Sequence, residues 1–123
     1  MKKIYSIKEA ETITPSVTIG DFFLKLLHAA TNGHILHLQS KSYSEHKALQ
    51  TYYEELPDLV DNIIEQWQGA YQTIVEYPST YEAPNMDALQ EVMAIRDFVV
   101  KNRAIVGDYT SIQNQVDELM SLL

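Results

Sequence analysis

Residues 42–77 read SYSEHKALQTYYEELPDLVDNIIEQWQGAYQTIVEY, and this stretch decides the fold class. Ser42 and Glu45 have the spacing of a helix capping box, so a helix should begin just after Ser42. Its apolar side chains recur every three or four residues, as on the buried face of a helix. These positions are Leu49, Tyr52, Tyr53, Leu56, Val60, Ile63, Ile64, Trp67, Tyr71 and Ile74. The pattern predicts one long helix that contains Pro57 and ends before Pro78.

An earlier helix is predicted to start at Thr18, which is followed by Asp21 at the spacing of an N-terminal cap. Its apolar face is formed by Phe22, Phe23, Leu26, Leu27, Ala30 and, one turn beyond His34, Leu38. Gly33 weakens this helix by about 1 kcal/mol, and a glycine in mid-helix suggests that a neighbour packs close to it. Residues 1–17 lack a clear period and are predicted to be an N-terminal arm.

The second half of the chain adds two more helices after a long connection. Residues 77–85 contain two prolines and read as a loop. A third helix is predicted over residues 86–106, with Gly107 as its C-terminal stop. Residues 110–113 form another capping box, which opens a short last helix. These four amphipathic helices predict a single all-α domain over residues 18–123. Because one longer connection follows the second helix, the domain is expected to be a four-helix bundle with the crossover topology of ferritin-like folds.

Composition narrows the function classes. The chain has 123 residues, 46% of them hydrophobic, no cysteine and a net charge of −8. The lack of cysteine excludes disulfides and thiolate metal sites and fits a cytoplasmic protein. No apolar run is long enough to span a membrane, and the N-terminus does not read as a secretory signal. The negative charge makes nucleic-acid binding unlikely and favours cation binding.

Histidines and carboxylates are the residues left to carry chemistry, because the chain has no phosphate-binding loop, nucleophile elbow or HExxH motif. Asp61 and Glu65 are four residues apart and share one side of the long helix. His46 lies fifteen residues before Asp61 on the same helix, which is about 22 Å along its axis. His46 and Asp61 could therefore share a metal ion only if two copies of the helix run antiparallel, as a twofold dimer allows.

The spacing of these residues resembles the ferroxidase segment of the Dps family, the miniature ferritins or DNA-binding proteins from starved cells. Counted from His34, the family's second histidine matches His46 at twelve, its aspartate Asp61 at twenty-seven and its glutamate Glu65 at thirty-one. Gln50 stands at sixteen, where an acidic residue is frequent. Tyr43 matches an aromatic position of the family, and the sequence Gly107-Asp108-Tyr109-Thr110 is similar to the turn before the family's last helix.

The resemblance implies that His34 and His46 of one subunit bind iron together with Asp61 and Glu65 of its twofold mate. Gln50 and His37 are weaker candidate ligands, and His37 is expected more as a surface or supporting residue. Imidazole nitrogen with carboxylate oxygen suits Fe(II). The family oxidises Fe(II) with hydrogen peroxide or dioxygen and stores ferric iron in a hollow, dodecameric shell, so this chain is expected to be an iron-binding homo-oligomer and a possible ferroxidase.

Less specific interpretations remain open. The histidines can be core or interface residues, the two acids can be part of a solvated stripe, and His28 is expected to be structural. The second hypothesis is a non-catalytic ferritin-like assembly or interaction protein, of a kind that would suit a phage genome. A nucleic-acid-protecting role ranks third because of the charge.

Overall fold

The computed structural model describes residues 17–123, which form four α-helices and one 3-10 turn. The helices are α1 (Ile19–Gln39), α2 (Tyr43–Tyr71), α3 (Ala88–Asn102) and α4 (Thr110–Leu122), and the 3-10 turn η1 (Arg103–Val106) follows α3. The predicted all-helical fold is confirmed over this range. The predicted arm at 1–17 lies outside the described residues except for Val17.

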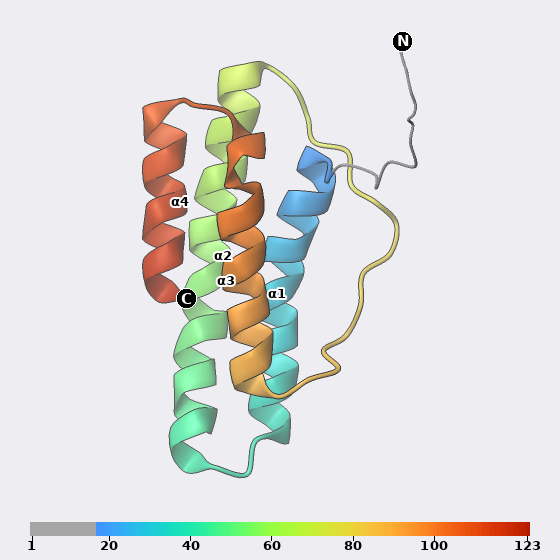
Figure 1. Cartoon of the computed structure of the whole chain (residues 1–123), viewed down its shortest axis with the longest axis vertical. Coiled ribbons are helices and arrows are strands. Elements are labelled where there is room, and N and C mark those ends of the chain that lie inside the picture. Colours follow the sequence, from blue (N-terminus) through green and yellow to red (C-terminus); the bar gives the residue numbers. More distant parts are fainter. Residues whose placement is uncertain (1–16) are drawn as a thin grey trace.

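The helices lie side by side along one long axis (Figure 1). α1 and α2 form an antiparallel hairpin with a short turn at one end. From the end of α2, residues 72–87 run back along the length of the bundle beside α1, so α3 starts at the opposite end and runs parallel to α2. A tight turn then reverses the chain into α4. The long connection therefore covers one side of α1.

Side-chain caps begin three of the helices. Thr18 Oγ1 accepts the Asp21 N–H at 3.0 Å, and the Asp21 carboxylate accepts the Thr18 N–H at 2.9 Å, so the predicted capping box is confirmed. Ser42 caps α2 as predicted, but the Glu45 carboxylate accepts a hydrogen bond from Ser40 Oγ instead of closing the box. Asp87 caps α3, although the sequence placed that start at residue 86.

Two predicted details at the helix ends are wrong. α2 ends at Tyr71, and Ile74, predicted to lie on its apolar face, is 78% exposed in the following segment. Gln72 there adopts a left-handed conformation with φ 55°. The predicted capping box at residues 110–113 is absent, since the N-cap of α4 is Tyr109 and Gln113 binds elsewhere.

The core lies between the helices and draws on all four. The most completely buried side chains are Phe22, Phe23, Leu26, Leu56, Val60, Ile63, Ile95, Val99, Val106, Ile112, Val116 and Leu119. Each full burial of this kind stabilises the fold by roughly 1.5–3 kcal/mol. Phe22 stacks on Phe98 of α3 at 5.6 Å, and Phe23 meets Trp67 of α2 edge-on at 6.0 Å, so α1 packs against both helices.

Gly33 lies at a close approach between α1 and α2. A Cβ at this position would lie 2.8 and 2.9 Å from two ring carbons of Tyr52. Normal carbon–carbon contacts are about 3.5–4.0 Å, so only glycine fits without a shift. The close neighbour expected from a glycine in mid-helix is thus confirmed. No helix within residues 17–123 has both the length and the apolar character needed to cross a bilayer.

Candidate metal-binding residues and a buried polar cluster

The turn between α1 and α2 brings two histidine rings together. His37 Nδ1 lies 2.8 Å from the carbonyl oxygen of His46, and His46 Nδ1 lies 3.0 Å from the carbonyl oxygen of His37. A carbonyl oxygen only accepts, so Nδ1 carries the proton in both rings. The rings stack with their centres 3.6 Å apart. Each ring is therefore held in one orientation, in which Nε2 is the nitrogen that can carry the lone pair.

His34 lies one turn earlier on α1 and completes what we call the histidine cluster: His34, His37 and His46. Its exposed ring stacks on Tyr53 of α2 at 4.2 Å and lies 6.0 Å from the His37 ring. His37 is only 7% exposed, so the surface position expected for it is wrong, and its carbonyl oxygen accepts the hydrogen bond from His46 Nδ1. The cluster is thus built from α1 and α2 together.

The two predicted acidic ligands lie elsewhere on α2. Asp61 and Glu65 are both exposed, and a hydrogen bond with Asp61, followed by the Asp61 charge, raises the pKa of the Glu65 carboxyl. Within residues 17–123, no three histidine, aspartate or glutamate side chains are grouped as a metal site. Within one chain, the histidine cluster and the two acids therefore do not form a common metal site.

Gln50, the weaker candidate, is engaged in surface hydrogen bonds. Its Nε2 donates to the Glu54 carboxylate at 3.2 Å, and its Oε1 accepts from Lys47 Nζ at 3.4 Å. These contacts link side chains on one face of α2 and do not join Gln50 to a histidine.

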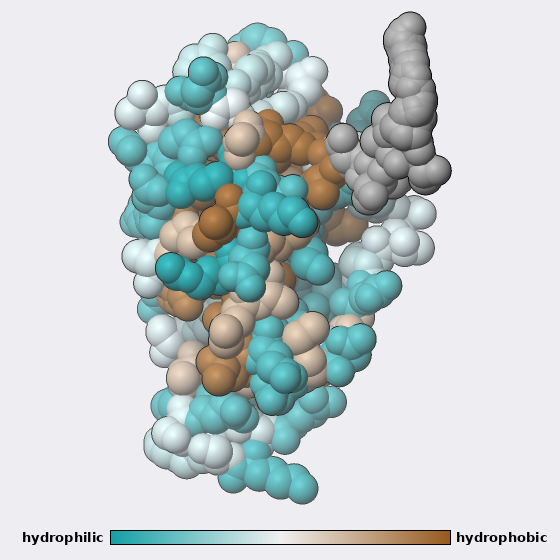
Figure 2. All heavy atoms as spheres, in the orientation of Figure 1, coloured by the Kyte–Doolittle hydropathy of each residue, from teal (hydrophilic) through white to brown (hydrophobic). Residues whose placement is uncertain are grey.

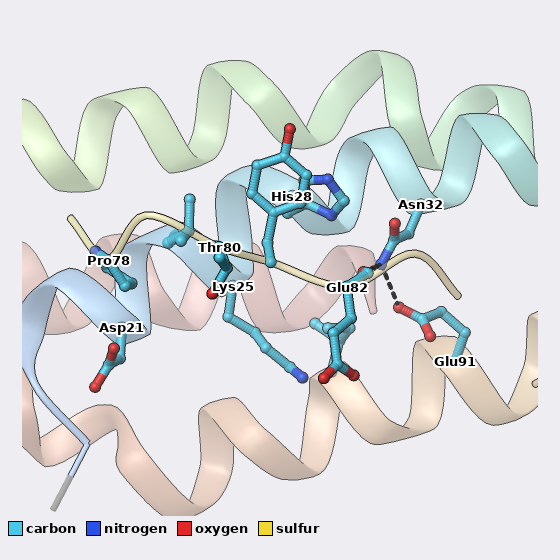
Figure 3. Close-up of a pocket in the computed structure, with 11 residues that line it drawn as sticks. Asp21, Lys25, His28, Asn32, Pro78, Thr80, Glu82 and Glu91 are labelled. Atoms are coloured by element: carbon cyan, nitrogen blue, oxygen red, sulfur yellow. Dashed lines mark hydrogen bonds between the residues drawn. The ribbon is translucent and has the colours of Figure 1, made fainter. Parts of the chain in front are cut away.

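A second polar group, which the sequence did not identify, lies inside the bundle. Glu91 of α3 is 7% exposed, and its Oε2 accepts a hydrogen bond from Asn32 Nδ2 at 3.3 Å. The same nitrogen donates to the Glu82 carbonyl oxygen at 3.2 Å (Figure 3). His28 lies one turn before Asn32, and its ring is covered by Tyr81 at 3.6 Å. Segment 72–87 therefore closes this group against α1.

The sequence contained a signal for this buried polar group. Glu91 is four residues from Ile95 and eight from Val99, both buried in the core, so it occupies the buried stripe of α3. Asn32 is likewise three residues after buried Ala29. A carboxylate and an amide on buried stripes of two helices indicate a polar contact inside the bundle.

Comparison with known proteins places the chain in a family. Residues 37–123 match the model of a family of unknown function (DUF5856), and the chain belongs to that family. It is also 32% identical over 107 residues to the uncharacterized 14.6 kDa protein in the mobD-ri intergenic region of Enterobacteria phage T4, covering 84% of this chain and 80% of the relative. No solved structure matches.

Proposed function

We propose that this member of the DUF5856 family is an iron-binding miniature ferritin that takes up Fe(II) between paired subunits. In this proposal the bundle is ferritin-like and residues 72–87 are its crossover connection. His34 and His46 of one subunit bind the ion together with Asp61 and Glu65 of the other. Gln50 and His37 are not direct ligands.

The observation that carries the proposal is the orientation of the His46 ring. Its Nδ1–H is donated to the His37 carbonyl oxygen, which is how metal-binding histidines are commonly oriented through a backbone carbonyl. The lone pair on Nε2 is then available to a cation. His37 keeps this arrangement in place, because its own Nδ1–H is donated to the His46 carbonyl oxygen.

The acidic half of the proposed site also suits a cation. Asp61 and Glu65 interact with each other strongly enough to raise the pKa of the Glu65 carboxyl. Two neighbouring carboxylates repel each other when both are ionised, and a bound cation removes that repulsion. Nitrogen and oxygen donors together match the preference of Fe(II).

A twofold dimer is required to join the two halves. His46 and Asp61 are fifteen residues apart on α2, a separation of about 22 Å along the helix. Two α2 helices running antiparallel would place the histidine end of each against the acidic part of the other and would create two equivalent sites. Fe(II) is the substrate in this proposal, with hydrogen peroxide or dioxygen as the oxidant, a dodecameric shell as the largest assembly and the cytoplasm as the setting.

Anaerobic Fe(II) titration of the purified protein tests the proposal. His34→Ala and Glu65→Gln should each weaken binding by more than about tenfold, since even changes behind the ligands cost about 10–100-fold in affinity. Glu55→Gln, which removes another exposed carboxylate from α2, should leave binding unchanged. Wild-type protein that binds no Fe(II), or three variants that bind alike, would refute the metal site.

A second candidate is a non-catalytic helical assembly. Leu89, Met93 and Val100 lie on the outer face of α3 and are 69, 53 and 56% exposed. Figure 2 shows apolar patches along this helix, separated by hydrophilic side chains. In this candidate the three side chains, which recur at helical spacing, contact a second copy of the chain. It predicts an oligomer that resists chelators in sedimentation but dissociates in Met93→Glu.

A further inference from the structure

The fourth helix covers only part of the second. α4 has 13 residues and α2 has 29, so α4 is shorter by about 24 Å at 1.5 Å per residue. It packs on α2 and ends at Leu122, partway along that helix (Figure 1). Beyond this end, in the part of the chain that the structure describes, α4 covers neither the first half of α2 nor the start of α3.

An apolar pocket of about 330 Å³ lies at this uncovered place. Three helices contribute its apolar lining, which consists of Ala48, Leu49, Tyr52, Ala88, Leu89, Val92 and Leu122. Leu89 is 69% exposed. Covering these side chains would remove apolar surface from water, which favours an apolar occupant.

Carboxylates surround the apolar pocket. Glu45 lines it directly, and a second pocket of about 430 Å³ adjoins it at Leu122, which lines both. We call the two pockets together the α4-end groove. The second pocket adds the carboxylates of Glu54, Glu55, Asp58 and Glu118. Neither lining contains a lysine or an arginine, so the groove favours an occupant that is positively charged as well as apolar.

The first eight residues of the chain have this composition. They read MKKIYSIK and lie outside the residues that the structure describes. The segment contains three of the nine basic residues of the chain and no acidic residue. Its lysines alternate with the apolar side chains of Ile4, Tyr5 and Ile7. Residues 1–8 therefore complement the α4-end groove in both charge and polarity.

The chain is long enough to bring this segment to the groove. Gly33 lies against Tyr52, which lines the groove, and it is fourteen residues after Ile19, the first residue of α1. The groove is thus about 21 Å along the bundle from the start of α1. Eight residues span up to about 26–29 Å when extended, so residues 9–16 can bridge this separation.

We propose that residues 1–8 dock in the α4-end groove of their own chain. The apolar side chains of the segment cover Leu89 and Leu122, and its lysines lie near the carboxylates around the pocket. This contact removes apolar surface from water and pairs opposite charges. Because it covers Leu89 within one chain, it also competes with the contact to a second copy in the second candidate above.

Cysteine labelling tests the proposal, because the chain has no cysteine of its own. Ala48→Cys places a thiol in the groove, and Asn114→Cys places one on the exposed surface of α4 outside it. Each is made with the natural residues 1–8 and with Lys2→Glu, Lys3→Glu and Lys8→Glu together. The uncharged reagent iodoacetamide should label Ala48→Cys at least about threefold faster after the charge reversal, since surface ion pairs are weak but additive here. Labelling of Asn114→Cys should not change.

A charge swap tests whether the groove is the docking place. Glu55→Lys with Glu118→Lys, added to the charge-reversed segment, should slow the labelling of Ala48→Cys again, because opposite charges then face each other. A labelling rate that stays high would reject the groove.

Equal labelling of Ala48→Cys with either version of residues 1–8 would overturn the proposal. So would protection that is lost on dilution, because docking within one chain does not depend on protein concentration. That result would assign the groove to a second copy of the chain.

Discussion

Replacing Gly33 with alanine tests how closely α1 and α2 pack. The new Cβ would lie 2.8 Å from a ring carbon of Tyr52, so that ring or the helix must move by about 0.7 Å to reach a normal contact. The Tyr52 side chain is 6% exposed and cannot swing into solvent. Overpacking of this kind costs about 1–3 kcal/mol, and the better helix propensity of alanine returns about 1 kcal/mol. The net loss should be up to about 2 kcal/mol.

Gly69→Ala is the matched control, because a Cβ at Gly69 of α2 meets nothing within 4 Å. This variant should be stabilised by up to about 1 kcal/mol. The effect of alanine on the unfolded chain is common to both variants and cancels in their comparison. Urea unfolding should therefore rank Gly69→Ala above wild type and Gly33→Ala below it. If Gly33→Ala is as stable as Gly69→Ala, the close approach of α1 and α2 is incorrect.

Other predictions concern the polar contacts. Burial lowers the pKa of His28 in the folded protein below its ordinary 6.5. As the pH falls through 6.5, the unfolded chain therefore binds more protons than the folded one, and the free energy of unfolding should decrease. His28→Gln should reduce that decrease between about pH 7.5 and 5.5 in urea unfolding, and an unchanged slope would contradict the burial of His28. Gln113 bonds to the side chain and carbonyl of Arg103 and to the Gly107 carbonyl, so Gln113→Ala should cost about 1–3 kcal/mol. Thermal unfolding measures that loss, and Asn114→Ala, exposed on the same helix, should not show it.

The helix starts could be predicted because their signals are local. Thr18 and Ser42 are caps in both the sequence interpretation and the structure, since the side chain and the N–H it accepts are three residues apart. The all-helical class follows in the same way from apolar residues at helical spacing. At the helix starts and along the apolar faces, the local helix preference and the packing of the folded chain agree.

The end of α2 could not be predicted, because contacts distant in sequence decide it. Ile74 continues the apolar period of the helix, but Val75 is the residue that becomes buried, at 5% exposure. The side chain of Gln68 accepts the Val75 N–H at 3.0 Å and stabilises the turn. At the start of α4, Gln113 bonds to Arg103 and Gly107, so it is not available to complete a capping box.

The candidate site could be predicted only in part, because some of its contacts join residues that are distant in sequence. The sequence gives the spacing between His46 and Asp61 and hence their separation on one helix. It does not indicate that the His37 and His46 rings stack, because this depends on the geometry of the turn between α1 and α2. The pairing of two subunits is a property of two chains and remains a prediction.

Subunit complementation tests the shared iron site most directly. One variant lacks the histidines (His34→Ala with His46→Ala), and the other lacks the acids (Asp61→Asn with Glu65→Gln). Neither variant alone should bind Fe(II), but a mixed dimer contains one intact site out of two. If an equal mixture is refolded together and dimers form at random, about half of the dimers are mixed, so about one quarter of the wild-type sites should be recovered. Recovery of Fe(II) binding at that level supports a site shared between subunits. A mixture that binds no Fe(II), although the wild type binds it, would contradict the account.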